Sequence, residues 1–443
     1  MRFRLDSEAT IDGNRIIGGS PPSMLRISAA GRQVLDAILS GNDLNSGQLL
    51  DRMLELGIVH PAIEPIPIRD GEGRAVVTVV TPTLGAPHHR QRHGLDDDHL
   101  ILVDDGSNPP VQDATIRLDT NMGPAAARNR GLAAVNTEFC AFVDADVDTG
   151  DDDHWLRSLL GHFDDPHVAA VAPRVRSRAG RGALERHEQH HGALDMGDKP
   201  APVRPGTRIA YVPAAALICR TSAIREIGGF DEAMRTGEDV DLIWRLVDAG
   251  HTVRYAPDVE VVHEPRSSWR AFLSQRIGYG ASAALLEHRH PGRVAPLVIS
   301  PWSAVALAAL LIPRRPWYGI PTAVAAMVLA AMRLANRLPE LGRGEALRIV
   351  SAGTTRAAVA LAKAVRRTWW PVALVLLPLR PVRRLVLLSV LAARSPLVVV
   401  DDLAHGAGVW KGALRERSFA ALAPRISHSR PERRTTSTYH SAS

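Results

Sequence analysis

The sequence predicts an α/β fold built on a mainly parallel β-sheet, with a small winged-helix-like domain before it and an apolar helical region after it. Short, continuous apolar runs alternate with helix-like stretches in the middle of the chain, which is typical of parallel strands covered on both faces. The first 63 residues have a different outline: a hairpin, two helices and a strand. Beyond Arg293 long uncharged stretches begin.

A chain of 443 residues is too long for one hydrophobic core, so several domains are expected. We place a winged-helix-like domain at 1–70, a catalytic domain at 71–292 and a basic, apolar helical region at 293–420. The polar stretch 421–443 is expected to be a disordered tail.

Charge is divided unevenly between the two halves of the chain. From Arg293 onward there are 22 Lys and Arg against 6 Asp and Glu, so the first 292 residues carry a net −10 of the total +6. An acidic front half argues against nucleic acid as a partner, because phosphate attraction drives such binding. A basic, apolar rear half suits an anionic membrane surface. Two cysteines and a charged N-terminal stretch favour neither a disulfide framework nor a cleaved secretion signal.

The N-terminal elements follow from local signals. Asp12-Gly13-Asn14 between apolar runs predicts a hairpin. Ser28 and Ser46 are the expected N-caps of two amphipathic helices, the second of which stops at Gly57. Ile58-Val59 begins a final strand. Prolines 61, 65 and 67 then mark a linker.

The strands of the central sheet are predicted from five apolar runs: AVVTVV, HLILV, FCAFV, HVAAVA and YVPAAALIC. Between Val147 and Tyr211 lies a polar stretch rich in Gly, Arg and His that is too long for a simple connection. We expect it to be a mobile or acceptor-facing insertion.

The apolar rear contains two segments close to the ~20 residues needed to cross a bilayer. Val294 to Ile312 is 19 residues without a charge, and Pro316 to Met332 is 17. Prolines interrupt both, so spanning and interfacial or re-entrant arrangements remain open. The basic pairs 314–315 and 383–384 favour the cytoplasmic side of the membrane.

Three acidic clusters stand at strand ends or helix starts, where open α/β sheets bind ligands. Asp104 and Asp105 end the second strand of the sheet. Asp144 and Asp146 follow the next long strand and share one side of it, so that they can hold a divalent cation. Taken alone, Asp104 and Asp105 could form a plain Asx turn, and Asp-Ala-Asp is a weak pattern.

The third cluster, Glu238 and Asp239, lies in the first turn of a helix, where the dipole favours ionised carboxylates. We therefore expect Asp239 to have an ordinary pKa of ~4. Gly123-Pro124 opens an Ala-rich helix whose first N–H groups favour an anion, and Arg128 adds charge there. His263 ends a strand, where a lone histidine is more often structural than a ligand.

In this order and spacing the clusters resemble family 2 glycosyltransferases of the nucleotide-sugar-binding (GT-A) type. The resemblance rests on VVTVVTPT, ILVDDGS, NMGPAAARNRGL, FVDADV, GGFDE, GEDVDLIWR and VEVVHEP, over about residues 75–265. Over its whole length, including RAFLSQRIGYGASAALLEHRHPG, the chain is similar to the branch of that family that acts in mycofactocin biosynthesis. The front domain resembles the peptide-recognition (PqqD-like) elements of ribosomal-peptide pathways.

The resemblance implies how the donor is held. One of Asp104 and Asp105, together with the loop after the first strand, would bind uracil and ribose. Asp144, Asp146 and His263 would hold Mg²⁺ or Mn²⁺ against the diphosphate. The implied donor-binding set is Pro82, Thr83, Asp104, Asp105, Gly123, Arg128, Asn129 and Asp144.

The resemblance also implies an inverting transfer, with Asp239 as the base and Glu238 as the alternative if the register differs. Two features depart from the family pattern. The connection between the first two strands of the sheet is shorter than is usual in the family, because only 17 residues separate Thr83 from Ile101. The histidines at 88, 89 and 93 in this connection could mimic a metal site. The chain also lacks the Gln-x-x-Arg-Trp motif of processive synthases.

Together these features predict an inverting, metal-dependent glycosyltransferase at the cytoplasmic face of a bacterial cell membrane. It would move a sugar, by resemblance glucose from UDP-glucose, onto a peptide-derived redox cofactor precursor or its precursor peptide. One alternative is a transferase acting on a lipid or cell-wall glycan. Another is a catalytically inactive peptide-binding scaffold.

Overall fold

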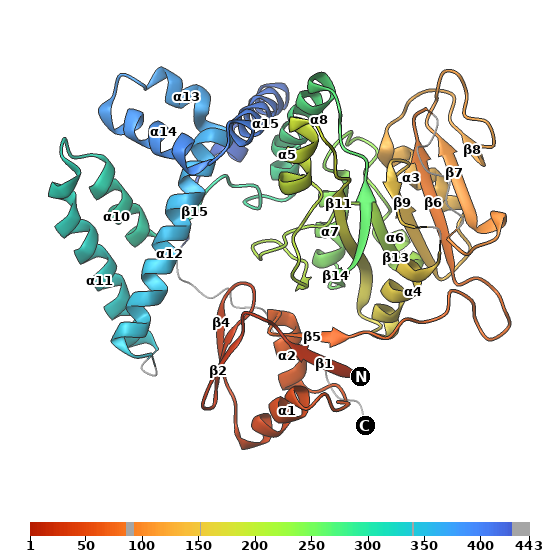
Figure 1. Ribbon diagram of the computed structural model, residues 1–443, viewed down its shortest axis with the longest axis horizontal. Coiled ribbons are helices and arrows are strands. Elements are labelled where there is room, and N and C mark those ends of the chain that lie inside the picture. The colour runs from red at the N-terminus through yellow and green to blue at the C-terminus, as the bar shows by residue number, and fades with distance from the viewer. Residues whose placement is uncertain (86–92, 151, 339–340, 428–443) are drawn as a thin grey trace. The chain divides into compact units, whose positions relative to one another are not determined.

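The computed structural model describes residues 1–85, 93–150, 152–338 and 341–427 (Figure 1). The chain divides into two compact units, Met1–Gln275 and Arg276–Ser443. These two units are coarser than the four ranges expected from the sequence, which stay predictions.

The first unit begins with a small module that follows the predicted order of elements. The hairpin forms at the predicted turn: Asp12 pairs with Arg15, and Gly13 has a φ of +57°, which glycine adopts without strain. Ser28 caps the first helix by accepting from the backbone N–H of Gly31. The elements are β1 (Arg2–Leu5), β2 (Thr10–Asp12), β3 (Arg15–Gly18), β4 (Ser23–Arg26), α1 (Ala29–Leu39), α2 (Gln48–Leu56) and β5 (Val59–Ala62).

One predicted cap in this module is wrong. Helix α2 begins at Gln48, so its N-cap is Gly47, whose backbone is extended, and Ser46 lies one position too early. The predicted stop at Gly57 is confirmed, since this residue caps the helix in the left-handed conformation. Strand order is β2-β3-β4 in one sheet and β1-β5 in a second.

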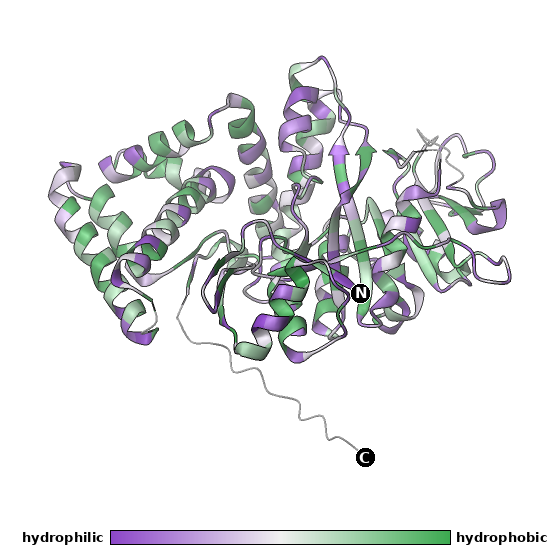
Figure 2. Ribbon diagram, turned by 60° about the horizontal axis from the view of Figure 1, so that its bottom comes forward, coloured by the Kyte–Doolittle hydropathy of each residue, from purple (hydrophilic) through white to green (hydrophobic). Residues whose placement is uncertain are grey.

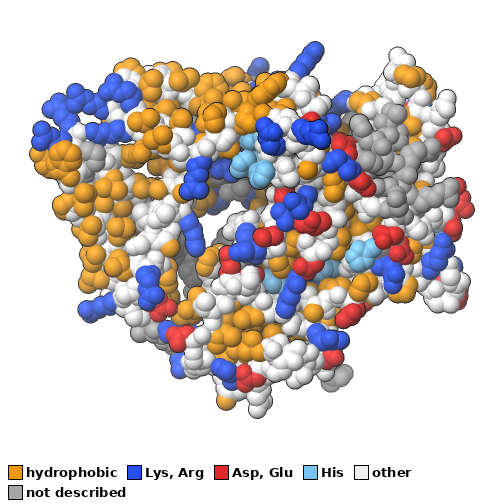
Figure 3. Space-filling view, in the orientation of Figure 1, with side chains coloured by type: hydrophobic (Ala, Val, Ile, Leu, Met, Phe, Trp, Pro, Cys, Tyr) orange, Lys and Arg blue, Asp and Glu red, His pale blue; other side chains and the backbone are white. Residues whose placement is uncertain are grey.

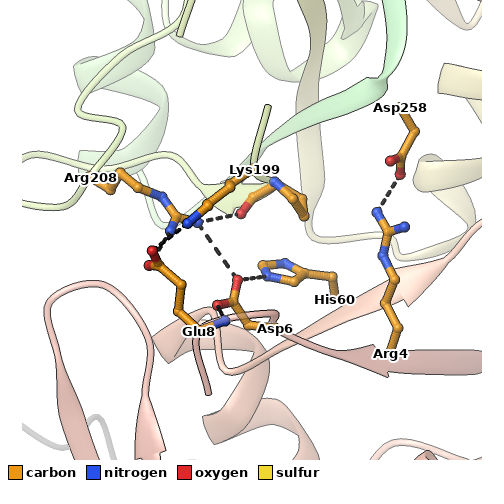
Figure 4. A network of polar contacts seen from close by, with 8 residues as sticks. Arg4, Asp6, Glu8, His60, Lys199, Arg208 and Asp258 are labelled. Carbon is orange, nitrogen blue, oxygen red and sulfur yellow. Dashed lines mark hydrogen bonds and ion pairs between the residues drawn. The ribbon is translucent and has the colours of Figure 1, made fainter. Parts of the chain in front are cut away.

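A polar network joins the module to the sheet-containing part of the same unit (Figure 4). The carboxylate of Asp6 is buried, lies 2.9 Å from Nε2 of His60 and pairs with Arg208 at 3.7 Å. Arg208 also donates to Glu8, which pairs with Lys199 as well. The network therefore links both ends of the module to the segment around β12 (Ala201–Pro202), which lies between α5 (Ala183–His191) and β13 (Ala216–Arg220).

The rest of the first unit is built on a nine-stranded sheet with the order β10-β14-β11-β13-β9-β6-β7-β8, and β12 pairs with β14. All five predicted apolar runs form strands. The sheet is mixed and not wholly parallel, because β13 runs antiparallel to both β9 and β11. Its strands are β6 (Val77–Thr83), β7 (Leu100–Asp104), β8 (Ile116–Arg117), β9 (Phe139–Val143), β10 (Val147–Asp148), β11 (Val168–Ser177), β12 (Ala201–Pro202), β13 (Ala216–Arg220) and β14 (Thr252–His263).

Helices cover both faces of the sheet, which explains why its strands are apolar on both sides. Val79 packs in one core cluster with Leu156 of α4. On the opposite face, Gly131 of α3 lies so close to Val80 that an added Cβ would come within 2.2 Å of it. The helices of this unit are α3 (Pro124–Ala134), α4 (His154–Leu160), α5 (Ala183–His191), α6 (Thr221–Glu226), α7 (Glu238–Asp248) and the first part of α8 (Trp269–Ala281).

The polar stretch expected to be a mobile or acceptor-facing insertion has defined structure, and whether it faces the acceptor stays a prediction. It contains α4, strand β11 and helix α5, and the side chains of His187 and Glu188 of α5 are buried. Helix α5 was not predicted because the segment is rich in Gly, Arg and His and has few apolar residues at helical spacing. The histidines proposed as a mimic of a metal site are only partly within the described residues: His88 and His89 lie outside them. His93 is buried against Thr149 and Trp155.

The second unit is helical. One helix, with its flanking turn at Trp317–Arg337, is long and apolar enough to cross a membrane. Apolar colour runs along much of α10 and α11 in Figure 2. The unit contains the last part of α8, then α9 (Ala283–Arg289), β15 (Val298–Ile299), α10 (Pro301–Leu311), α11 (Ile320–Arg337), α12 (Arg343–Ala364), a π-helical turn (Val365–Trp369), α13 (Trp370–Val375), α14 (Arg380–Ala392), α15 (Pro396–Arg415) and β16 (Arg425–Ile426).

Candidate active site

The carboxyl ends of three parallel strands bring several predicted site residues to one edge of the sheet. Strand β6 pairs in parallel with β7 on one side and β9 on the other. Thr83 lies opposite Asp104 in this register, and Asp144 directly follows β9. Pro82 is buried within β6. This edge is where an open α/β sheet binds its ligand.

Asp104 and Asp105 are held by the loops around them. Asp104 is fully buried and accepts from the backbone of Ser107 and Val111 and from Arg117. Burial alone would raise its pKa, but these hydrogen bonds and the charge of Arg117 hold the pKa of Asp104 below its ordinary value. The carboxylate of Asp104 therefore holds the loops at the sheet edge, and its contact with a donor stays a prediction, as does that of Asp105.

The two oxygens of Asp105 accept from the backbone of Met122 and Gly123, at 2.7 and 2.9 Å. Gly123 has a φ of +102°, where a side chain would be strained, and it caps α3 ahead of Pro124. Asp105 thus fixes the start of the helix that was expected to face the anionic donor. Thr83 donates to the carbonyl of Gly85 in the neighbouring loop.

Arg128 joins two of the acidic clusters, a role that the sequence did not reveal. One guanidinium nitrogen donates to Asp144 at 2.6 Å and another donates to Glu238 at 2.8 Å. Arg128 is only 4% exposed, and it also lies over the ring of Phe230 at 5.4 Å. A buried cation between two carboxylates brings the ends of β9 and α7 together, although 110 residues separate Arg128 from Glu238.

Asp239, next to Glu238 in the first turn of α7, differs from its neighbour. Its Oδ1 accepts from the backbone of Val240, and the side chain is half-buried. Burial first, and then the charge of Glu238, raise the pKa of Asp239 to about 7, against the lowering effect of Arg128. The expected ordinary pKa is wrong because the dipole of one helix turn is weaker than desolvation beside a second carboxylate.

Asn129 makes contacts that hold the fold of the site. Its amide donates to the carbonyl of Phe230, and its side-chain oxygen accepts from the N–H of the same residue. Gly229, with a φ of +72°, lies against this amide so closely that a Cβ would come within 2.6 Å of the oxygen. Asn129 therefore fixes the turn that precedes α7, and its predicted contact with the donor stays a prediction.

Asp146 and His263 meet where β10 pairs with the end of β14. Nε2 of His263 lies 3.3 Å from Oδ2 of Asp146, and Arg266 reaches the same oxygen, also at 3.3 Å. Burial would raise the pKa of Asp146, but His263 and Arg266 lower it. Arg266 was not predicted, although the sequence carried a signal: a basic residue three positions after His263.

The residues expected to hold a metal do not form a complete site by themselves, and their carboxylates suit a cation that also takes ligands from a substrate. No three His, Cys, Asp or Glu side chains in the described ranges form a complete metal site. Mg²⁺ needs only one or two carboxylates when phosphates supply other ligands. Asp144 and Asp146 keep side-chain exposures of 30% and 17%.

The fold and this site define a class of enzyme. The family model described as glycosyl transferase family 2 matches residues 89–228, which include the strand ends and the carboxylates at 104, 105, 144 and 146. The chain is a glycosyltransferase that uses a nucleotide-sugar donor.

Similarity to known proteins extends well beyond the catalytic core. The chain is 39% identical to the pre-mycofactocin glycosyltransferase of Mycobacterium tuberculosis, over 94% of this chain and 95% of that protein. It is 23% identical to an O-antigen chain rhamnosyltransferase of Salmonella typhimurium, over 42% of this chain and 64% of that protein. A solved mannosyltransferase from Pyrobaculum calidifontis, in complex with GDP-mannose and Mn²⁺, aligns at 17% identity and a TM-score of 0.41, over 80% and 90% of the two chains.

The chain belongs to the family of pre-mycofactocin glycosyltransferases. The match covers nearly the full length of both proteins, so it includes the N-terminal module and the helical unit as well as the sheet.

Proposed function

We propose that this chain transfers a hexose from a nucleotide sugar, with UDP-glucose as the first candidate, to pre-mycofactocin. Full-length similarity to a pre-mycofactocin glycosyltransferase supports the acceptor. The cluster of Asp144, Arg128, Glu238 and Asp239 at the sheet edge supports the chemistry. The N-terminal module is proposed to bind the peptide-derived acceptor or its precursor peptide.

The reaction is a single displacement at the anomeric carbon. The acceptor oxygen forms a bond to that carbon, the bond from the carbon to the diphosphate oxygen breaks, and the configuration inverts. The hydroxyl proton passes to a carboxylate of the enzyme as the new bond forms. One base is sufficient, and no covalent sugar intermediate is required.

Asp239 is the best-placed base among the clustered carboxylates. A pKa of about 7 lies near the working pH, so Asp239 is substantially ionised and still basic enough to accept a proton. Glu238 is held in a buried ion pair by Arg128, which keeps its carboxylate occupied. Arg128 positions the two clusters, since it contacts both Asp144 and Glu238.

Asp144, Asp146 and His263 would hold Mg²⁺ or Mn²⁺. When bound, the cation supplies positive charge against the diphosphate as that leaving group becomes more negative. Two arginines contact the proposed ligands: Arg128 donates to Asp144 and orients it, and Arg266 pairs with the same oxygen of Asp146 as His263 does. The cation requirement is part of the proposal.

The proposal is tested by incubating the full chain with pre-mycofactocin and UDP-glucose and following the acceptor by mass spectrometry. We expect a mass increase of one or more hexose units that requires Mn²⁺ or Mg²⁺. GDP-mannose and dTDP-rhamnose serve as donor controls. The mass increment reports both the class of the sugar and the number of units.

Two other outcomes would replace the proposal. Transfer to a polyprenyl phosphate but not to pre-mycofactocin would show a lipid-linked acceptor, for which the exposed apolar helices of the second unit are the supporting observation. Cation-dependent UDP binding and slow UDP-glucose hydrolysis would exclude an inactive scaffold. If the chain neither binds UDP with a cation nor hydrolyses UDP-glucose, it is an inactive scaffold and the catalytic assignment fails.

A further inference from the structure

Large exposed apolar side chains are concentrated in the second unit. Within the described ranges, 32 large hydrophobic residues are exposed, and 27 of them lie at or after Val298. The catalytic unit has an ordinary surface by comparison. Apolar exposure on this scale marks an interaction surface.

Helix α11 packs with its small residues inward and its large ones outward. Ala323, Ala326 and Ala331 are 3–5% exposed, and the first two contact α10 around Ala306. The outward residues are 39–49% exposed, and they are Ile320, Val324, Val328, Leu329 and Met332. A helix of a water-soluble core has the reverse pattern, whereas small residues between helices are typical of packing in lipid.

Helix α14 shows the same arrangement independently. In α14 the buried residue is Ser389, at 1% exposure, while Leu387 and Leu391 are 60% and 65% exposed. Leu374 and Val375 at the end of α13 are exposed as well. Helix α14 thus buries a hydroxyl and exposes leucines, and this arrangement is unfavourable if water covers those leucines.

Charge indicates what covers this surface. Residues 293–400 contain fifteen Lys and Arg, two Glu and no Asp. Arg314 and Arg315, between α10 and α11, and Arg380 and Arg383, at the start of α14, are exposed beside the apolar faces. Figure 3 shows hydrophobic side chains gathered over these helices with basic ones among them. Apolar faces bordered by arginine complement the anionic headgroups of a lipid leaflet.

Helix lengths decide between crossing the bilayer and lying on it. The 11 residues of α10 and the 13 of α14 extend about 17 and 20 Å, short of the ~30 Å hydrocarbon core. Among the helices with exposed apolar faces in the described part of the chain, α11 with its flanking turn is the one that is both long and apolar enough. It packs against α12, which exposes Arg348 in its second turn and Arg356 near its middle. If α11 crossed, these arginines would enter the hydrocarbon, which is costly.

We propose that the outward faces of α10 (Val305 and Leu310), α11, α13 and α14, here called the lipid face, dock the second unit on an anionic membrane surface without crossing it. Arginines at the rim contact phosphate headgroups, while the leucine, valine and isoleucine side chains enter the outer part of the acyl region. The cytoplasmic leaflet, which is rich in anionic lipid, is the matching surface. This inference does not depend on the proposed acceptor.

Vesicle co-sedimentation of the full chain tests the lipid face. We expect binding to vesicles of phosphatidylcholine with about 30 mol% phosphatidylglycerol to be at least ~10-fold tighter than to phosphatidylcholine alone. The double variant Val324→Glu, Val328→Glu should lose most of this binding. Leu39→Glu, which changes a 54% exposed leucine on α1, is the matched control and should bind like the wild type. Cation-dependent UDP binding by each variant reports that it is folded.

A second experiment tests whether α11 crosses the bilayer. Tyr318→Cys and Leu338→Cys place single reactive thiols at the two ends of α11, while the native Cys140 and Cys219 are fully buried. On sealed vesicles, a membrane-impermeant maleimide added outside should label both ends. Val328→Cys carrying an environment-sensitive dye should shift to the blue on binding.

Three results would overturn the proposal. Labelling of only one end of α11 would show a crossing helix. Equal binding to neutral and anionic vesicles would remove the role of the arginines. Failure to bind either vesicle, with a dimer that Val324→Glu, Val328→Glu dissociates, would show that the surface joins two copies of the chain.

Discussion

The raised pKa of Asp239 makes a quantitative prediction about the pH dependence of the reaction. If Asp239 is the base, its ionised fraction limits kcat/KM on the acid side. With a pKa of about 7, that fraction rises from ~0.1 at pH 6 to ~0.9 at pH 8, so kcat/KM should rise roughly tenfold. A base with an ordinary carboxyl pKa of ~3.9 would be ionised throughout this range and give a change of less than ~1%.

The variant Glu238→Gln tests the cause of the shift. It removes the negative charge beside Asp239 and leaves the helix start otherwise similar in shape. Burial still raises the pKa, but the contribution of Glu238 is lost, so the acid limb of kcat/KM should move to lower pH. Glu226→Gln, which changes an exposed carboxylate at the end of α6, is the control and should leave the limb in place.

The assay is initial-rate UDP release with subsaturating donor and acceptor between pH 5.5 and 8.5, because kcat/KM reports the free enzyme. UDP binding by calorimetry at each pH separates loss of donor affinity from loss of the base. A flat profile from pH 6 to 8, or an acid limb that Glu238→Gln leaves unmoved, would refute the reasoning about Asp239.

The remaining predictions concern the site and the docked module. Asp239→Asn should lower kcat by ~10² or more with little change in UDP affinity. Folding raises the pKa of Asp239 from 3.8 to about 7, so ionisation of Asp239 lowers the free energy of unfolding as the pH rises from 4 to 7. The Asn variant avoids this loss and should be more stable than the wild type at pH 8, by at most ~4 kcal/mol in urea denaturation. Arg128→Met leaves two carboxylates unpaired and should lower the free energy of unfolding by ~3 kcal/mol, and Arg128→Lys should restore little of it. Asp146→Ala should weaken Mn²⁺-dependent UDP binding in calorimetry, and unchanged affinity would count against a cation at this place. Arg208→Ala should cost ~1 kcal/mol and speed tryptic cleavage between the module and the sheet, whereas an unchanged cleavage rate would show that the ion pairs in Figure 4 do not hold the module.

Much of the fold was predictable because its signals are local. The apolar runs became strands β6, β7, β9, β11 and β13, since a strand buried on both faces requires continuous apolar residues. The turn at Gly13 and the caps at Ser28 and Gly57 depend only on neighbouring atoms. Strand direction was less predictable, because apolar composition does not tell an antiparallel β13 from a parallel one.

The site residues divide in the same way, into those with a local signal in the sequence and relations that depend on the fold. Asp144 and Asp146 could be identified as paired oxygen donors from their spacing, and Glu238 and Asp239 from the first turn of a helix. Their relation could not be identified, since the link runs through Arg128, 110 residues away from Glu238 in the chain. Asn129 was expected to contact the donor, yet its side chain bonds to Phe230.

The sequence by itself determined the α/β class, the positions of the carboxylates and the separation of an acidic catalytic half from a basic, apolar rear, because each depends on residue type and spacing along the chain. Only the tertiary structure decided which groups share a buried environment. Desolvation and the charge of Glu238 raise the pKa of Asp239, and inward-facing alanines leave the large side chains of α11 outside. Both effects arise from what surrounds a side chain in space, and the order of residues does not encode that directly.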